Sequence, residues 1–223
     1  MTGTALKFIA VVSMLIDHTG DVLFPGQLWL RYIGRLAFPI YCFLIVEGFI
    51  HTRNVMKYMA RLLVFGIVSE IPFDLAFFEE ISYPGYQNVF WTLLLGLMSI
   101  YLMSLVKIED IRLRLPLQMM ICVPFALIGQ LAHTDYRWIG VVLISGMYLF
   151  RSVEVLRIAT AGIVFLPVFI NDIEYFGMLS FIPMHFYNGK RGRTGKILQW
   201  GFYLFYPVHL LTLAFIRDRM MRG

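Results

Sequence analysis

Charged residues are scarce in this chain of 223 residues: Asp, Glu, Lys and Arg make up 15% of it, and apolar residues 59%. The mean hydropathy is +0.73, and apolar stretches recur with short polar breaks from one end to the other. Soluble cores of this size are not so hydrophobic along their whole length. The composition therefore excludes soluble domains and predicts one integral membrane domain over residues 1–223.

Cysteine is rare as well, and the two that exist, Cys42 and Cys122, fall inside apolar stretches. Such positions favour small buried hydrophobic residues over a disulfide or a metal pair, so we expect no metal site. The first residues have no basic segment before an uninterrupted apolar core and no small-residue cleavage site, which predicts a retained anchor rather than a removable signal. No internal repeat or low-complexity tract is visible.

Apolar runs long enough to cross the hydrocarbon core predict a bundle of about nine transmembrane helices, with about eight to ten as the range. No run alternates with period two as a barrel strand does, so the expected fold is an all-α polytopic membrane protein with a buried polar site. The sixth and eighth runs are short and contain Gly or Pro, and we expect either to be re-entrant or tilted. The runs cover 6–24, 28–50, 56–78, 89–106, 115–132, 138–150, 153–170, 173–187 and 197–216.

Lys and Arg are concentrated in alternate loops, which predicts a cytoplasmic N-terminus because cytoplasmic loops are rich in these residues. The opposite loops carry acids, as in Glu79-Glu80 and Asn171-Asp172. With nine crossings, the basic tail from Arg217 onward lies outside, against the rule. Basic loops beside anionic lipid explain the net charge of +5 without nucleic acid, and together they could also attract a polyphosphate ligand. These loops hold Arg53, Lys57 and Arg61, then Lys107, Arg112 and Arg114, then Arg151 and Arg157, then Lys190, Arg191, Arg193 and Lys196.

Ionisable residues inside the predicted helices mark the candidate site, because a charge at a helix centre costs at least about 2.5 kcal/mol by insertion scales. The spacing of Lys7 and His18 corresponds to about three helical turns, or about 16 Å, with about 20° of rotation. One face of the first helix thus carries a cation near the inner side and an imidazole in the outer half. The predicted topology brings further polar residues to that outer layer, namely Asp17, Asp21, Arg35, Glu70, Asp74, Asn88 and His209.

Structural roles compete with chemical ones for several of these residues. Arg35 paired with Glu70 or Asp74 would let helices pack, and His209 would simply bond a neighbouring backbone carbonyl. For His18 we favour a chemical role, because it follows an acid, has Asp21 one turn further on and is aligned with Lys7.

Seven blocks of the sequence resemble the TraX family, and the resemblance covers nearly the whole chain. The blocks are Ile16-Asp-His-Thr-Gly, Ile33-Gly-Arg-Leu-Ala-Phe-Pro-Ile, Val46-Glu-Gly-Phe-Ile-His-Thr-Arg-Asn, Ser69-Glu-Ile-Pro-Phe-Asp, Gln87-Asn-Val-Phe-Trp-Thr-Leu, Tyr187-Asn-Gly-Lys-Arg-Gly and Phe205-Tyr-Pro-Val-His-Leu. The family is named for a conjugation protein that acetylates the N-terminus of pilin, and it is similar to the wider superfamily of multi-pass membrane acyltransferases. In that superfamily a basic residue and a histidine mark the first helix, with a spacing similar to that of Lys7 and His18. One departure is that the family's Asp-Tyr-Gly reads Asp135-Tyr136-Arg137 here.

The resemblance implies an acetyltransferase of the bacterial inner membrane that takes acetyl groups from cytoplasmic acetyl-CoA. His18 would be the general base or the acetyl carrier, acting on an amine or hydroxyl of a pilin, glycan or lipid acceptor at the outer side. Asp17 or Asp21 would hold its tautomer, and Arg35 or Asn88 would stabilise the oxyanion. The donor phosphates would lie among Lys7, Arg53, Lys57, Lys190 and Arg191.

Two other function classes stay open. A proton-coupled transporter or flippase also uses intramembrane acids, bases and histidines, although the sequence shows no paired repeat and Lys7 has no obvious use in a proton relay. A non-catalytic assembly factor leaves no chemical motif by which to reject it.

Overall fold

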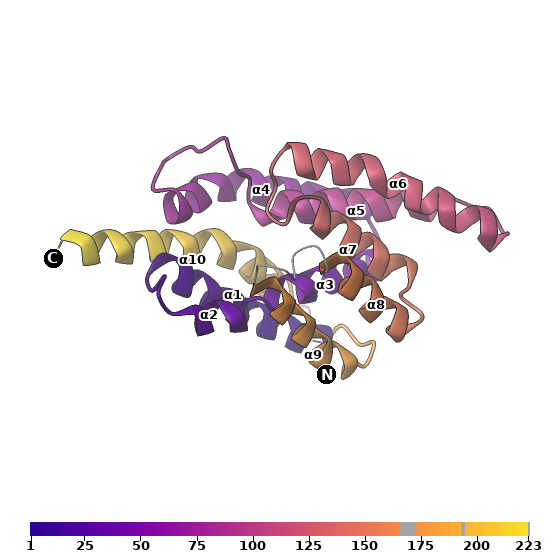
Figure 1. Ribbon diagram of the computed structural model, residues 1–223, viewed down its shortest axis with the longest axis horizontal. Coiled ribbons are helices and arrows are strands. Elements are labelled where there is room, and N and C mark those ends of the chain that lie inside the picture. The colour runs from indigo at the N-terminus through magenta and orange to yellow at the C-terminus, as the bar shows by residue number, and fades with distance from the viewer. Residues whose placement is uncertain (166–172, 193–194, 223) are drawn as a thin grey trace. The chain divides into compact units, whose positions relative to one another are not determined.

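The structure, a computed structural model, describes residues 1–165, 173–192 and 195–222. These residues are helical and contain no β-strand, apart from a single bridge between Gln87 and Thr134 (Figure 1). The chain divides into two compact units, each built from separated segments of the sequence. Unit 1 holds residues 1–41, 68–83 and the described residues from 173 onward, and unit 2 holds 42–67 and 84–165. The predicted all-α fold is confirmed.

The helices follow the predicted apolar runs closely. Unit 1 contains α1 (Gly3–Val22), α2 (Leu28–Gly34), the start of α3 (Ala37–His51), the last part of α4 (Val55–Phe77), the 3-10 helix η2 (Ile173–Ser180), α9 (Phe181–His185) and α10 (Lys196–Arg222). Unit 2 contains the remainder of α3 and α4, with α5 (Val89–Leu105), α6 (Ile111–Leu131), α7 (Arg137–Leu149) and α8 (Glu154–Phe165).

Two predicted runs are not single helices, and each has a proline shortly after its break. The run over 28–50 breaks between α2 and α3, because the ring of Pro39 cannot fit against the carbonyl of Arg35, four residues earlier. The run over 173–187 consists of η2 followed by the five residues of α9. Pro183 conflicts in the same way with the carbonyl of Leu179, which agrees with the start of α9 only after that residue, at Phe181.

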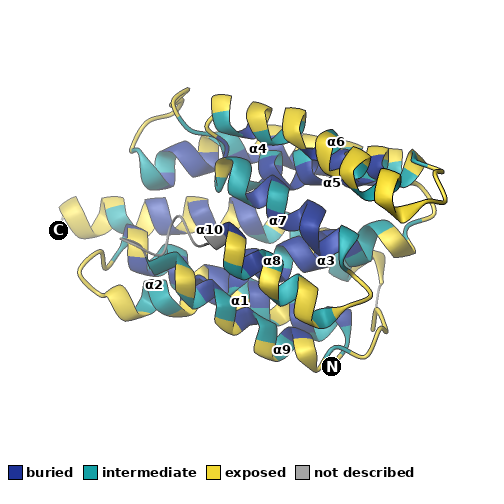
Figure 2. Ribbon diagram, turned by 45° about the vertical axis from the view of Figure 1, so that its right-hand side comes forward, coloured by how far each residue is buried: buried dark blue, intermediate teal, exposed yellow. Residues whose placement is uncertain are grey.

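Among the described residues, three segments are long and apolar enough to cross a membrane: Leu28–His51, Ile111–Leu131 and Lys196–Arg222, while α5 and α7 are shorter apolar helices. Within the apolar 18-residue stretch of α6, only 11% is buried inside the protein, and Figure 2 shows this helix largely exposed. Helices α1 and α4, of 20 and 23 residues, have the length of a span but carry ionisable residues of the predicted site. The apolar surface is consistent with a membrane protein, and the count of about nine crossings stays a prediction.

In unit 2, contacts between residues at successive positions along two helices show in which direction the helices run. Gln87 pairs with Thr134 at the starts of α5 and α7, and Ser99 lies 3.0 Å from Ser145 further along, so these two helices are parallel. Gly96 permits their close approach, because a Cβ there would lie 2.3 Å from Cδ1 of Ile144. Near the ends of α3 and α7, the rings of Phe49 and Tyr148 lie 5.6 Å apart.

The basic loops of unit 2 therefore gather at one end of that unit. The ends of α3, α5 and α7 share this end with the starts of α4, α6 and α8. The three loops between these helices carry the clusters beginning at Arg53, Lys107 and Arg151. The predicted alternation of basic loops holds within unit 2, and the side of the membrane that they face stays a prediction.

In unit 1, α1 and α10 lie side by side and run in the same direction. The rings of Phe8 and Phe202 are 5.2 Å apart near the start of both helices, and His18 meets His209 further along both. The C-terminal end of α10, which carries Arg217, therefore lies at the end opposite to the start of α1, which agrees with an odd number of crossings.

Arg217 gives a physical reason for a basic residue at that opposite end. Its guanidinium donates hydrogen bonds to the carbonyls of Ala76 at 2.7 Å and Leu75 at 2.8 Å. These carbonyls belong to the last turn of α4, where no further helical N–H groups are available to them. Arg217 is thus a cap for α4, so its position does not need to follow the distribution of loop charges.

Candidate active site

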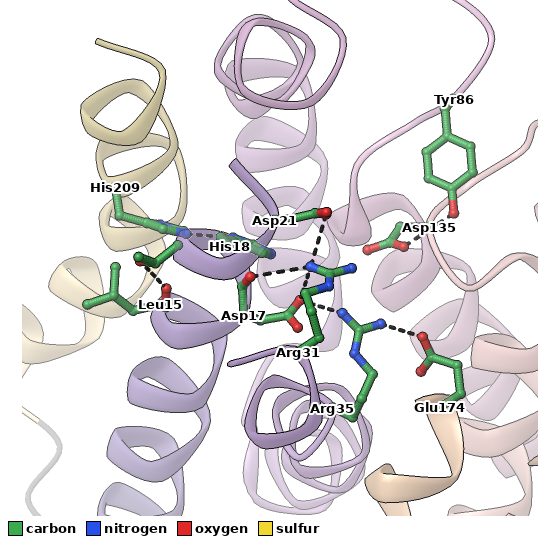
Figure 3. A network of polar contacts seen from close by, with 11 residues as sticks. Leu15, Asp17, His18, Asp21, Arg31, Arg35, Tyr86, Asp135, Glu174 and His209 are labelled. Atoms are coloured by element: carbon green, nitrogen blue, oxygen red, sulfur yellow. Dashed lines mark hydrogen bonds and ion pairs between the residues drawn. The ribbon is translucent and has the colours of Figure 1, made fainter. Parts of the chain in front are cut away.

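Two histidines far apart in the sequence meet in unit 1. Nδ1 of His18 on α1 lies 2.7 Å from Nε2 of His209 on α10, and the two rings are tilted by only 8° with centroids 5.0 Å apart (Figure 3). Nearly parallel rings joined through two nitrogens have the geometry of an imidazole to imidazole hydrogen bond.

The second nitrogen of His209 determines where the protons lie in this pair. Nδ1 of His209 is 2.7 Å from the carbonyl oxygen of Phe205, and a carbonyl can only accept, so this nitrogen carries a proton. In the neutral ring Nε2 is then an acceptor, and His18 must donate from Nδ1. His18 Nε2 is consequently left with a lone pair. The arrangement makes His18 a base with a defined tautomer.

Aromatic rings surround the pair. The His18 ring meets Phe77 of α4 edge to face at 5.2 Å and Tyr206 at 6.0 Å. On α10 the residues that face α1 are Phe202, Tyr206 and His209, spaced as one stripe of a helix. Lys7 Nζ lies 5.6 Å from the centroid of the Phe202 ring, so this stripe accompanies α1 from Lys7 to His18. Since α1 is one continuous helix, the predicted alignment of Lys7 with His18 is confirmed as geometry.

An ion-pair network lies on another face of α1 (Figure 3). Asp17 accepts hydrogen bonds from Arg31 at 3.1 Å and from Arg35 at 2.5 Å. Arg31 also pairs with Asp21 at 2.9 Å, and Arg35 pairs with Glu174 at the start of η2. Three carboxylates and two guanidiniums thus connect α1, α2 and η2.

Two glycines let α2 approach α1 closely enough for these contacts. A Cβ at Gly34 would lie 2.1 Å from Oδ1 of Asp17, and a Cβ at Gly20 would lie 2.7 Å from Cβ of Leu30. Small residues at such crossings are the usual means by which membrane helices pack tightly. The sequence places Gly34 directly before Arg35, so the close approach also delivers the guanidinium to the carboxylate.

The acids beside His18 do not hold its tautomer, contrary to the expectation for Asp17 and Asp21. Neighbouring residues on a helix point about 100° apart, so Asp17 faces α2 whereas His18 faces α10. Arg31 pairs with the carboxylates of both Asp17 and Asp21, and the hydrogen bond with His209 orients the His18 ring instead. His209 also bonds the backbone carbonyl of Phe205, as its structural interpretation predicted, and its role in catalysis stays a prediction.

The remaining outer-layer residues have identifiable places. Oδ2 of Asp74 accepts a hydrogen bond at 2.9 Å from the backbone N–H of Tyr83 and fixes the loop after α4, rather than pairing with Arg35. Glu70 lies one turn earlier on α4, in unit 1. Asn88 belongs to unit 2, where it caps α5 through Phe90 N–H at 3.0 Å and donates to the Gly66 carbonyl at 2.8 Å. Its membership of the layer around His18 stays a prediction.

The predicted donor-binding residues of unit 1 share one end of that unit. The first residues of the chain run along the segment before α10: Gly3 and Thr4 donate backbone hydrogen bonds to the carbonyls of Lys190 at 2.9 Å and Arg191 at 3.0 Å. The start of α1, which carries Lys7, is therefore fixed beside Lys190 and Arg191. Arg53 and Lys57 lie at the basic end of unit 2, and Arg193, like Asn171 and Asp172, lies outside the described residues.

The segment Asp135-Tyr136-Arg137 has an unusual backbone in unit 2. Tyr136 and Arg137 have φ values of 60° and 43°, in the left-handed region that favours glycine. The glycine that the family pattern has at the third position would suit this conformation. Tyr86 Oη donates to Asp135 at 3.4 Å beside it.

Residues that the sequence did not single out complete the site. Arg31 and Glu174 were missed, although each is essential to the network around Asp17. Among the described residues, no group of three or more His, Cys, Asp or Glu side chains is arranged to hold a metal ion.

Comparison with known proteins assigns the family. The model of the family described as "TraX protein" matches residues 2–217. This chain belongs to the TraX family. It is 33% identical over 244 residues to the "Probable fimbrial assembly protein FimC, serogroup H1" of Dichelobacter nodosus, covering 94% of this chain and 93% of that protein.

A shorter similarity is also found. The "Uncharacterized protein RP591" of Rickettsia prowazekii is 31% identical over 96 residues, which cover 43% of this chain and 35% of that protein. No solved structure matches. The family resemblance seen in the sequence blocks is thus confirmed.

Proposed function

We propose that this TraX protein is a membrane-embedded acetyltransferase that moves an acetyl group from acetyl-CoA to an amine or hydroxyl of a pilus subunit. The observation that carries the proposal is the free Nε2 lone pair of His18, which the hydrogen bond to His209 fixes in place. Membership of the TraX family and the similarity to a protein named for fimbrial assembly support a pilus component as the acceptor.

The proposed transfer needs one proton carrier. The acceptor nitrogen or oxygen attacks the thioester carbon while His18 Nε2 takes its proton. The carbon–sulfur bond then breaks, and Nε2 returns the proton to the departing CoA sulfur. In the two-step alternative, Nε2 itself attacks the thioester and carries the acetyl group before the acceptor arrives. The same lone pair serves both routes.

His209 stabilises the protonated state of His18 in this scheme. When Nε2 of His18 gains a proton, the Nδ1–H that points at His209 becomes a charge-assisted donor, which strengthens the existing hydrogen bond. The Phe205 carbonyl keeps His209 in the tautomer that can accept.

The donor would reach His18 from the end of unit 1 that carries Lys7, Lys190 and Arg191. The distance along α1 from Lys7 to His18 is about 16 Å, which suits an extended pantetheine arm with its phosphates at the basic end. With the N-terminus in the cytoplasm, as the loop charges predict, this end faces the cytoplasmic acetyl-CoA pool.

The proposal is tested in cells by mass spectrometry of the pilus subunits. Subunits from wild-type cells should carry one acetyl group that is absent when the gene is deleted. Complementation with His51→Ala should restore the group, because His51 is an exposed residue at the end of α3 that bonds within its own helix. Complementation with His18→Ala should not restore it. Subunits with equal masses in the wild-type and deleted strains would reject the proposed acceptor.

A further inference from the structure

Two arginines of unit 2 are half-buried without an acidic partner. Arg61 lies in the second turn of α4 and Arg157 in the first turn of α8, and the Nε atom of each is buried with no hydrogen-bond partner. Among the described residues, no Asp or Glu side chain forms a salt bridge with either guanidinium. An uncompensated charge in such a position is costly, because desolvation is not repaid by a counter-ion.

Both guanidiniums instead rest on aromatic rings of the same unit. The centre of the Arg61 guanidinium is 5.6 Å from the Tyr58 ring centroid, and that of Arg157 is 5.6 Å from the Phe43 ring centroid. Tyr58 in turn packs on Gly48 of α3, where a Cβ would lie 2.8 Å from its hydroxyl oxygen. A cation–π contact of this kind holds a guanidinium in place and leaves its outer N–H groups available to a ligand.

The two arginines share the basic end of unit 2. Arg61 and Arg157 each lie within two turns of the start of their helices, and these starts belong to the end where α3 and α7 finish. Arg151 is also at this end, where it stacks on Tyr148 at 4.7 Å. Most of the other basic loop residues of unit 2, such as Arg53 and Arg112, are exposed, whereas Arg61 and Arg157 are only partly exposed. Topology alone therefore does not explain them.

We infer that this end of unit 2 binds a phosphate-bearing ligand through Arg61 and Arg157. Phosphate oxygens accept the paired N–H groups of a guanidinium in a fixed, planar geometry, and they supply the missing negative charge. The phosphate could belong to the nucleotide part of the CoA donor or to an anionic lipid headgroup. Binding of the CoA nucleotide rests on the proposed function, whereas binding of a lipid headgroup does not.

The test measures binding rather than transfer, so that its failure is separable from failure of the proposed function. The protein is placed in phosphatidylcholine nanodiscs, and the affinity for coenzyme A is measured by calorimetry. Arg61→Gln and Arg157→Gln should each weaken binding about tenfold or more, the loss expected for one charge-assisted contact. Arg112→Gln is the matched control, because Arg112 is an exposed cation at the same end, in the first turn of α6.

A second arm examines the lipid source. Protein purified from membranes that contain phosphatidylglycerol is analysed by native mass spectrometry, and the retained lipid should fall in Arg157→Gln but not in Arg112→Gln if the headgroup is the ligand. Arg157→Lys, which keeps the charge but loses the planar fork, should lose most of the binding in the responding arm. Its unchanged thermal unfolding would show that the fold is intact.

The outcomes separate clearly. A loss specific to Arg61 and Arg157 in either arm supports the phosphate site and identifies its source. Equal effects of Arg112→Gln and Arg157→Gln in both arms would show a diffuse charge effect and overturn the inference. A turnover defect in His18→Ala concerns the proposed function alone, because neither binding arm measures acetyl transfer.

Discussion

Substitution of Gly34 by alanine tests the contact on which the ion-pair network depends. The new Cβ would lie 2.1 Å from Oδ1, 2.2 Å from Cβ and 2.4 Å from Cγ of Asp17, all well below any tolerated contact. Relief requires either that α2 moves away from α1 or that Asp17 leaves the Arg35 guanidinium at 2.5 Å. Overpacking costs about 1–3 kcal/mol of folding free energy, and a broken buried ion pair costs about 3–5 kcal/mol. A partial shift of α2 combined with a weakened Asp17–Arg35 pair should therefore destabilise the protein by about 2–4 kcal/mol.

Thermal unfolding in detergent measures this cost. A thiol-reactive fluorophore reports unfolding through Cys42 and Cys122, which are both buried in the folded protein. Gly34→Ala should lower the midpoint by about 5–15 °C for a chain of this size. Gly201→Ala is the control, since a Cβ at that position of α10 meets nothing within 4 Å and alanine favours the helix by about 1 kcal/mol. Equal midpoints for both variants would refute the close packing of α1 on α2.

Four further predictions follow from the same geometry. His209→Leu should reduce acetyl transfer by about a hundredfold, while His209→Gln, whose amide oxygen can still accept from His18, should retain much more activity; equal rates would contradict the orienting role. Arg217→Ala should destabilise the protein by about 1–2 kcal/mol through loss of the α4 cap, and Arg219→Ala should not. Equal midpoints of thermal unfolding for these two variants would contradict the capping role of Arg217. Arg137→Gly should stabilise by about 1 kcal/mol, because φ is 43° there, and a lowered midpoint would argue against that backbone. Lys7→Glu should weaken coenzyme A binding with the midpoint of unfolding unchanged, and equal affinity in calorimetry would exclude a phosphate role for Lys7.

Apolar runs predicted the helices well because each helix of a membrane protein must be apolar over a fixed length. The run over 89–106 became α5, and the run over 56–78 became α4. Pro39 and Pro183 follow the two breaks closely, but proline alone was not a sufficient signal, since α4, α6 and α10 continue through prolines of their own. Counting apolar residues ignores the missing N–H and the ring clash that prolines introduce.

The histidines of the site were found for the same reason, because a polar side chain is conspicuous in an apolar run. Their partners were not readable, since pairing between helices depends on packing that the sequence does not display. Asp17 precedes His18 in the chain and so looked like its partner, yet adjacent residues on a helix face different neighbours. Glu174 lies far along the chain, at the start of η2, and only the packing of the helices shows that Arg35 reaches both Asp17 and Glu174.

The central claim is that His18 Nε2 carries the proton during acetyl transfer, and the rate of CoA thiol release by purified protein tests it most directly. With acetyl-CoA and a peptide that bears the N-terminus of the pilus subunit, the wild type and His51→Ala should release thiol at the same rate. His18→Ala should release it about a hundredfold to ten-thousandfold more slowly, the range for loss of a positioned general base. Undiminished release by a folded His18→Ala protein would contradict the account.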